Sequence, residues 1–501
     1  MELFSNLALG FETALTLQNL GYALIGCLLG TLIGVLPGIG PLATISMLLP
    51  ITYALPPVSA LIMLAGIYYG AQYGGSTTAI LVNVPGEASS VMTSLDGYEK
   101  AKQGRAGSAL AIAALGSLFA GCVGTLVLAA LAGPMTVFAL KFGPTENFAL
   151  VVLGLCGAIV LASDSLIKSI AMVIFGLLLG LVGIDVNSGK PRFDFGIAEL
   201  ADGIGFITIA LAFFGIAEIL RNLESPEDTE KFTSKITRLW PTRQDFRRAT
   251  PAVLRGTALG SLLGVLPGGG AALSAFAAYM LERKVSRYAN ELGTGAVEGV
   301  AAPESANNAA SQTSFVPMLT LGLPSNGVMA LMVGAMTIHN IQPGPQVMTS
   351  NPTLFWGLIA SMWIGNLMLV ILNLPLIGIW VKLLTIPYRY LFPAILTFCV
   401  IGVFSTQNNV FDIYVVAAFS VLAMIVLKLG FPPVPLLLGF ILGPMMEEHF
   451  RTALVLSRGD FLVFFKHPIS LALLITAALL LCLVLLPRVR KGREQAFQED
   501  A

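Results

Sequence analysis

Charged residues are scarce in this sequence. Asp, Glu, Lys and Arg make up 11% of its 501 residues, whereas soluble domains carry roughly 25%. This scarcity excludes an ordinary soluble protein. The formal net charge is zero, so we expect no basic surface for nucleic acid.

Residues that form metal sites and disulfides are also few. The 3 histidines and 5 cysteines are scattered without ligand or CxxC spacing, so the sequence predicts neither a metal centre nor a disulfide framework. The patterns GxxxxGK(S/T), HExxH and GxSxG are absent as well. Their absence argues against ATP hydrolysis by a P-loop, zinc-protease chemistry and serine-hydrolase chemistry, and we expect no enzyme.

Long apolar runs dominate what is present. Hydrophobic residues make up 56% of the chain. Residues 110–131, 204–220 and 469–486 are each long enough to cross the hydrocarbon core of a bilayer. The sequence therefore predicts an all-α polytopic integral membrane protein with about 10–14 hydrophobic segments.

One hydrophobic segment is broken by proline and glycine, and the same break occurs twice. Residues 30–40 read Gly-Thr-Leu-Ile-Gly-Val-Leu-Pro-Gly-Ile-Gly, and residues 260–270 read Gly-Ser-Leu-Leu-Gly-Val-Leu-Pro-Gly-Gly-Gly. Irregular backbone at membrane depth is tolerated only inside protein or beside a cavity. A single copy is equally well explained as a kink between packed helices. The repeat favours a transporter binding site built from broken or re-entrant helices.

The duplication extends beyond this motif. Residues 80–85 align with residues 319–324, and Pro134 and Lys141 align with Pro375 and Lys382. We therefore divide the chain into a first repeat at residues 1–221, a hydrophilic linker at 222–251 and a second repeat at 252–465. Residues 466–501 are expected to form an extra helix followed by a basic tail.

The basic loops fix the expected orientation of the two repeats. A second break is predicted at residues 83–90, and its counterpart lies at residues 321–324. In the first repeat Lys100, Lys102 and Arg105 follow this second break, whereas in the second repeat the basic residues precede it, within residues 283–287. Because basic loops stay in the cytoplasm, the two repeats are predicted to have inverted topology. The linker and the tail are then cytoplasmic.

The motifs together resemble one family. The broken-helix pairs, the run Tyr-Gly-Gly-Ser-Thr-Thr-Ala-Ile-Leu-Val-Asn-Val-Pro-Gly-Glu at 73–87 and Glu-Ser-Ala-Asn-Asn-Ala-Ala at 304–310 are similar to the TctA family. This family comprises the large membrane subunits of tripartite tricarboxylate transporters. The resemblance implies a bacterial cytoplasmic (inner) membrane permease. It also implies a small TctB-like membrane subunit, a periplasmic TctC-like solute-binding protein, and symport of carboxylates such as citrate with Na⁺ or H⁺.

A carboxylate substrate needs positive partners, yet neither broken motif contains Lys or Arg. Backbone N–H groups at helix N-termini, polar side chains and co-transported cations are then expected to bind it. We assign these positions to a substrate and cation site: Pro37, Gly38, Gly40, Ser76, Thr77, Thr78, Asn83, Pro85, Gly86, Pro267, Gly268, Gly269, Gly270, Glu304, Asn307, Asn308, Pro324, Ser325 and Asn326.

Several simpler interpretations remain open from the sequence. The hydroxyls of residues 76–78 are equally suited to bonding the preceding helical turn. Glu304 and Glu87 suit a cation ligand, a proton carrier or a helix cap. For the whole chain, a membrane-embedded enzyme acting on lipid-linked substrates and a passive channel are the alternatives to a carrier surrounded by membrane lipids.

Overall fold

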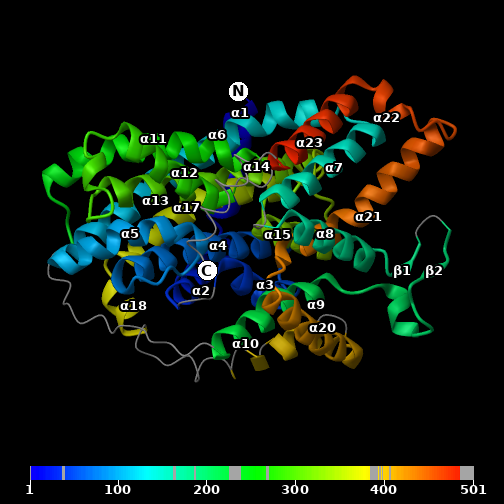
Figure 1. The fold of residues 1–501 in the computed structure, drawn as a ribbon, viewed down its shortest axis with the longest axis horizontal. Coiled ribbons are helices and arrows are strands. Elements are labelled where there is room, and N and C mark those ends of the chain that lie inside the picture. Colours follow the sequence, from blue (N-terminus) through cyan, green and yellow to red (C-terminus); the bar gives the residue numbers. More distant parts are fainter. Residues whose placement is uncertain are drawn as a thin grey trace.

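A computed structural model of the chain describes residues 2–36, 40–161, 165–185, 188–224, 239–266, 270–383 and 408–485, together with 393, 396–397 and 399–404. The described part is almost entirely helical (Figure 1). Its two strands, β1 (Gly183–Ile184) and β2 (Pro191–Arg192), form one short antiparallel hairpin. The expectation of an all-α chain is confirmed.

The helices of the first repeat follow one another along the chain. They are α1 (Glu2–Ala14), α2 (Leu17–Gly34), α3 (Pro41–Thr52), α4 (Pro57–Val82), η1 (Ala88–Ser90), α5 (Val91–Lys100), η2 (Ala101–Arg105), α6 (Ala106–Ala139), α7 (Pro144–Leu161), α8 (Leu166–Gly180), η3 (Ala198–Asp202), α9 (Phe206–Ala210), η4 (Leu211–Ile216) and α10 (Ala217–Glu224).

The remaining helices belong to the second repeat and the C-terminal segment. They are α11 (Arg243–Val265), α12 (Gly270–Val285), η5 (Ala289–Glu291), α13 (Glu298–Thr313), α14 (Phe315–Leu321), α15 (Gly327–Ile338), α16 (Val347–Ser350), α17 (Pro352–Asn373), α18 (Ile377–Leu383), α20 (Val410–Lys428), α21 (Pro433–Leu456), α22 (Val463–Lys466) and α23 (Pro468–Leu485).

Among the described residues, four helical stretches are long and apolar enough to cross a membrane: Leu17–Gly34, Ala88–Ala139, Pro352–Asn373 and Val410–Lys428. Shorter apolar helices accompany them, including α3, α8 and α15. These lengths and compositions agree with a multi-pass membrane protein. The predicted linker at 222–251 is too long, because α11 already begins at Arg243, where Thr242 and Asp245 form a capping box.

Both repeated motifs interrupt a helix. In the first copy α2 ends at Gly34 and α3 begins at Pro41, and in the second copy α11 ends at Val265 and α12 begins at Gly270. Residues 37–39 and 267–269 lie outside the described residues. The predicted break in the helix is therefore present at equivalent places in the two repeats.

The second break also occurs twice. Asn83 ends α4 with φ 56°, and Gly322, 239 residues later, ends α14 with φ 73°. This left-handed conformation costs glycine little free energy and is also accessible to asparagine. Either residue can therefore end a helix here without a steric clash between its side chain and the backbone. Helices restart after Pro85 and Pro324, where Glu87 caps η1 and Asn326 caps α15.

Glycines hold α2 tightly against α4. Three of them, spaced four residues apart along one face of α2, contact the backbone of α4: Gly26, Gly30 and Gly34. A Cβ atom added at Gly30 would lie 2.3 Å from the carbonyl oxygen of Ile67. Because real Cβ atoms do not approach an oxygen that closely, the two helices can meet at this distance only through glycine.

The second repeat uses the same packing. Three glycines of α11 contact the backbone of α13: Gly256, Gly260 and Gly264. A Cβ atom at Gly260 would lie 2.2 Å from the carbonyl oxygen of Ala306. Gly260 follows Gly30 by 230 residues and Ala306 follows Ile67 by 239, which are the two offsets of the sequence repeat. Corresponding positions therefore make corresponding helix contacts.

Helices of the two repeats are interleaved at the centre of the molecule. There α13 packs against α4, α5 and α6, and α17 packs against α2, α4 and α6 (Figure 1). Away from them, α7, α8, α21 and α23 pack together near the β-hairpin. The polar residues described next lie in the central group.

Candidate functional site

Glu304 of α13 is a carboxylate buried among helices of both repeats. Its side chain is 1% exposed. The hydroxyl of Ser76, on α4, lies 2.6 Å from Oε2 of Glu304, and the hydroxyl of Thr93, on α5, lies 2.6 Å from Oε1. Among the described residues no Lys, Arg or His forms an ion pair with Glu304. Both hydroxyl groups that donate to its carboxylate are neutral.

Two asparagines extend this group of polar side chains. Nδ2 of Asn308 donates to Ser117 Oγ on α6 at 2.7 Å and to the Glu304 carbonyl oxygen at 2.9 Å. Oδ1 of Asn307 lies 2.5 Å from the same nitrogen, so three oxygens share its two hydrogens, and the amide of Asn307 donates to Ser89 Oγ at 3.4 Å. Oδ1 of Asn308 is buried without a partner among the described residues. We call Ser76, Thr93, Ser117, Glu304, Asn307 and Asn308 the central polar cluster.

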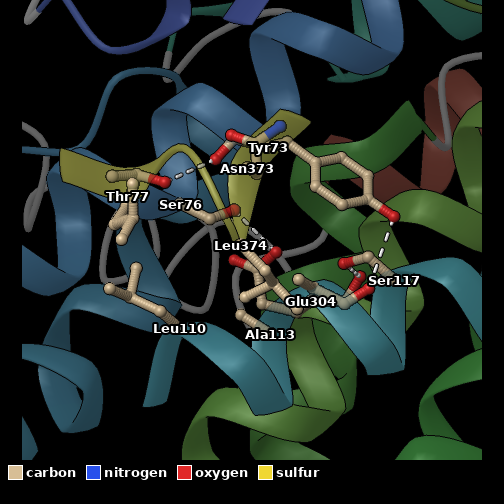
Figure 2. A pocket seen from close by; sticks show the side chains of 11 residues that line it. Tyr73, Ser76, Thr77, Leu110, Ala113, Ser117, Glu304, Asn373 and Leu374 are labelled. Atoms are coloured by element: carbon tan, nitrogen blue, oxygen red, sulfur yellow. Dashed lines mark hydrogen bonds between the residues drawn. The ribbon is translucent and has the colours of Figure 1, made fainter. Parts of the chain in front are cut away.

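A small cavity borders the cluster. Its volume is about 20 Å³, which is enough for one water molecule. Figure 2 shows Ser76 hydrogen-bonded to Glu304 beside it, with Tyr73, Ser117 and Asn373 also in the lining. Apolar residues from α6 and from the end of α17 complete the lining. In this conformation the cavity is too small for a di- or tricarboxylate.

One hydrogen bond joins equivalent positions of the two repeats. Nε2 of Gln72, on α4, donates to Oγ of Ser311, on α13. These residues are 239 positions apart, the offset that relates α4 to α13 and α14. Nε1 of Trp363 likewise donates to the carbonyl oxygen of Cys122 at 3.1 Å, 241 positions away, and 241 is the offset that relates Pro134 to Pro375. A residue touches its own counterpart only near a two-fold axis, so these contacts mark where such an axis would pass.

A second polar group lies beside the second broken helix. Oδ1 of Asn326 accepts from Met329 N at 3.0 Å as the cap of α15, and its amide donates to Ser314 Oγ at 3.3 Å. Ser325 donates to the Ser314 carbonyl oxygen at 3.4 Å. A Cβ added at Gly270 would lie 3.8 Å from Asn326. This group therefore adjoins the start of α12.

The structure brings some predicted site residues together and separates others. Five of them share the region of the small cavity: Ser76, Thr77, Glu304, Asn307 and Asn308. Thr78 instead donates to the carbonyl oxygen of Val35 at 3.0 Å, where α2 ends. Asn83 is exposed and only ends α4.

The other predicted positions either pack against the backbone or adjoin a helix cap, or they lie outside the described residues. Gly86 is buried, and a Cβ there would lie 2.4 Å from the carbonyl oxygen of Gly34. Pro85 and Pro324 precede helix caps, and Gly40 caps α3 in an extended conformation. Pro37, Gly38, Pro267, Gly268 and Gly269 fall outside the described residues.

Four polar residues of this region were missed by the sequence analysis: Gln72, Thr93, Ser117 and Ser311. None of them lies within the motifs at residues 30–40, 73–87, 260–270 and 304–310. The signal available was the repeat itself, since Gln72 and Ser311 occupy corresponding positions 239 residues apart. Two polar residues at one repeat position are candidates for contact near a symmetry axis.

A charged network joins the repeats at the end of α5. Asp96 is fully buried, and its Oδ1 accepts from the backbone N–H groups of Gly293, Gly295 and Ala296 at 2.7–2.9 Å. Its Oδ2 accepts from the Tyr279 hydroxyl at 2.9 Å. A single carboxylate of the first repeat thus fixes the loop that leads into α13 of the second.

Next to this loop is a polar cavity of about 400 Å³, which is lined by Lys100, Arg105, Arg248 and Asp245 among others. Burial alone raises the pKa of Asp245, but hydrogen bonds from Thr242 and the charges of Lys100 and Arg105 outweigh it and hold the pKa below its usual value. Arg248 is paired with Glu291 and Glu298. The network is therefore largely self-neutralised.

These features define a multi-pass membrane protein of the transporter class: apolar spans, helices broken at repeated positions, and a polar cluster buried between the repeats. More particularly, the chain belongs to the tripartite tricarboxylate transporter TctA family, whose model matches residues 20–438. It is accordingly a component of a tripartite tricarboxylate transporter.

Two relatives come from Agrobacterium vitis. The chain is 58% identical over 500 residues, covering both chains fully, to the "uncharacterized 52.8 kDa protein in TAR-I ttuC' 3'region". It is also 58% identical over 241 residues to the "uncharacterized protein in TAR-II ttuC' 3'region", covering 48% of this chain and all of that one. No solved structure matches the chain.

Proposed function

We propose that the chain is the large permease subunit of a binding-protein-dependent, cation-coupled transporter for di- or tricarboxylates such as citrate. It works in the bacterial inner membrane with a TctB-like small membrane subunit and a TctC-like periplasmic solute-binding protein. Substrate and cation bind between the two repeats, near the broken helices. Membership of the TctA family supports this function.

The observation that carries the proposal is the burial of Glu304 in a polar cluster made by both repeats. A carboxylate inside a membrane protein is costly and marks an ion or substrate pathway. The cluster supplies hydroxyl and amide groups from α4, α5, α6 and α13, so it can respond to movement of one repeat against the other. The starts of α3 and α12, directly after the two motifs, offer helix N-termini to an anionic substrate.

Reconstitution tests this function. We expect proteoliposomes that contain the chain and its small membrane subunit to take up labelled citrate or another di- or tricarboxylate when the solute-binding protein is added outside. Uptake should require an imposed H⁺ or Na⁺ gradient. Full-rate uptake by the purified chain alone would disprove the tripartite arrangement, and uptake that follows only the substrate gradient would indicate a channel.

We also propose that the two repeats are inverted in the membrane. Contacts of Gln72 with Ser311 and of Cys122 with Trp363 support a two-fold axis between the repeats, and the basic loops favour an axis in the membrane plane. An axis along the membrane normal would make the repeats parallel instead.

Cysteine labelling distinguishes the two arrangements. In a background in which exposed Cys482 is replaced by serine, we expect Lys102→Cys and Gln342→Cys to react with an impermeant maleimide from opposite sides of the membrane. Both positions are exposed. Lys102 lies in the basic loop after the second break of the first repeat, and Gln342 lies in the corresponding loop of the second. Labelling from the same side would establish parallel repeats.

A further inference from the structure

We propose that Glu304 carries a coupling proton and that the hydroxyl of Ser76 changes its hydrogen-bond partner as the proton binds and leaves. This inference rests on the proposed function and names its coupling ion. It follows from counting hydrogen atoms at the central polar cluster.

The Ser76 hydroxyl has two acceptors but one hydrogen. Its oxygen lies 2.9 Å from the carbonyl oxygen of Gln72, one turn back on α4, and 2.6 Å from Oε2 of Glu304. Both are hydrogen-bond distances. A hydroxyl has one hydrogen, so both contacts can be full, unshared hydrogen bonds only if Glu304 is protonated and donates to Ser76. When Glu304 is ionised, Ser76 must donate to it and release the Gln72 carbonyl.

Release of the proton from Glu304 therefore requires only one further change, which is a rotation of the Ser76 hydroxyl. In the protonated state the Glu304 carboxyl donates to Ser76 Oγ, and Ser76 donates to the Gln72 carbonyl. On release, the O–H bond of Glu304 breaks and the proton passes to a water molecule, while the electron pair stays on the carboxylate. The Ser76 hydroxyl then rotates to donate to Glu304. Thr93 donates to the other carboxyl oxygen in both states.

The geometry fits a proton better than a sodium ion. Oxygens bound to one cation the size of Ca²⁺ or Na⁺ each lie about 2.3–2.6 Å from it, so neighbouring ligands are well over 3 Å apart. The hydroxyl oxygens of Ser76 and Thr93 lie 2.6 Å from the carboxylate of Glu304. At that separation a hydrogen atom fits between each pair of oxygens, whereas a metal ion would require these side chains to move apart.

The cavity beside Glu304 gives a proton a route that excludes substrate. Its volume of about 20 Å³ suits one water molecule. Oδ1 of Asn373, in its wall, is buried without a partner among the described residues, so it can accept from such a water. A water in this cavity can therefore exchange a proton with Glu304 while a carboxylate is bound elsewhere between the repeats.

Few other titratable groups face Glu304. On α4, Tyr73 donates its hydroxyl to the carbonyl oxygen of Ala114 at 3.4 Å. Glu87 forms the capping box of η1 with Ser90, and its Oε1 accepts a hydrogen bond from the Ser89 hydroxyl. Towards Glu304, α5 presents Thr93, α6 presents Ser117 and α17 presents Asn373, none of which titrates. On α5, Asp96 is turned towards the 293–296 loop and saturated by its N–H groups.

Glu304→Gln imitates the protonated state, because its amide donates to Ser76 and its oxygen accepts from Thr93. In the reconstituted complex, with the membrane potential clamped at zero and a pH difference of one unit, one proton per substrate supports about tenfold accumulation. We expect the wild type to approach this value. Glu304→Gln should fall to about onefold while still exchanging labelled for unlabelled citrate. Glu99→Gln, an exposed carboxylate paired with Lys102, is the matched control.

Proton movement is read directly with a pH dye trapped in the vesicles. Substrate should acidify the lumen in the wild type and in Glu99→Gln, and not in Glu304→Gln. Sodium-driven uptake without acidification would overturn the proton assignment and leave the proposed carrier intact. Absence of any carboxylate transport by the full complex would instead contradict the proposed function.

Infrared titration of the purified protein tests Glu304 without transport. We expect a band from a buried protonated carboxyl group that titrates in the wild type and is missing in Glu304→Gln. Ser76→Ala should move the midpoint of that band to higher pH because the ionised carboxylate loses a donor, and Ser76→Thr should restore it. A titrating band unchanged by Glu304→Gln would overturn the proposal whatever the transport result.

Discussion

Alanine in place of Gly30 is expected to separate α2 from α4 and to remove most of the folded protein. The added Cβ would lie 2.3 Å from the carbonyl oxygen of Ile67 and 2.8 Å from its Cα. Both are backbone atoms, so no side chain can rotate away. Overpacking a tight contact costs about 1–3 kcal/mol and sometimes more, and we expect the upper end here. The fraction of monodisperse protein that survives heating in detergent measures the loss.

Gly21→Ala is the matched control on the same helix. Nothing lies within 4 Å of a Cβ added at Gly21, so we expect no loss and a slight gain from the helix propensity of alanine. Gly260→Ala should repeat the Gly30 effect in the second repeat, because its Cβ would lie 2.2 Å from the carbonyl oxygen of Ala306. If Gly30→Ala and Gly21→Ala were equally stable, close packing by glycine would not hold α2 against α4.

The sequence predicts the architecture at the level of elements. Apolar runs indicate spans, and proline with glycine indicates where a helix must stop, because both effects depend on local residues. The two breaks at Asn83 and Gly322 were therefore placed correctly. The start of α11 was not, because its capping box at Thr242 and Asp245 lies within a charged stretch that was interpreted as a loop.

The packing of the helices depends on residues that are far apart in the chain. The sequence marks Gly30 through its counterpart Gly260, but it does not identify the helix that Gly30 contacts. Only the neighbouring helix, α4, makes Gly30 intolerant of a Cβ, whereas Gly21 tolerates one. The same spacing in α11 becomes informative once the repeat offset identifies its partner on α13.

The sequence predicts only part of the candidate site, because the partners of its polar residues are far apart in the chain. Ser76, Glu304 and Asn308 were chosen because polar residues in apolar surroundings need partners. Which partners they find is set by the meeting of α4, α5, α6 and α13. Thr93 and Ser117 complete the cluster from helices on which no motif marked them. Asn83 was chosen on the same grounds but ends a helix at the surface.

Asp96 shows what a single long-range contact can fix. Its carboxylate is fully buried and joins α5 of the first repeat to the 293–296 loop and α12 of the second. Three backbone N–H groups converge on Oδ1, and the Tyr279 hydroxyl reaches Oδ2. Without the carboxylate these donors lose their acceptor. Each unsatisfied buried donor costs about 1–3 kcal/mol.

Asp96→Ala is therefore expected to destabilise the protein by about 3–6 kcal/mol, and to release the loop that leads into α13. Asp96→Asn should cost much less, because its amide oxygen still accepts from the loop and its amide nitrogen can donate to Tyr279. We expect the midpoint of thermal unfolding in detergent to be highest for the wild type, lower for Asp96→Asn and lowest for Asp96→Ala. Limited proteolysis should cut the 286–297 region in Asp96→Ala first. Equal stability of the alanine and asparagine variants would show that the converging N–H groups do not depend on Asp96.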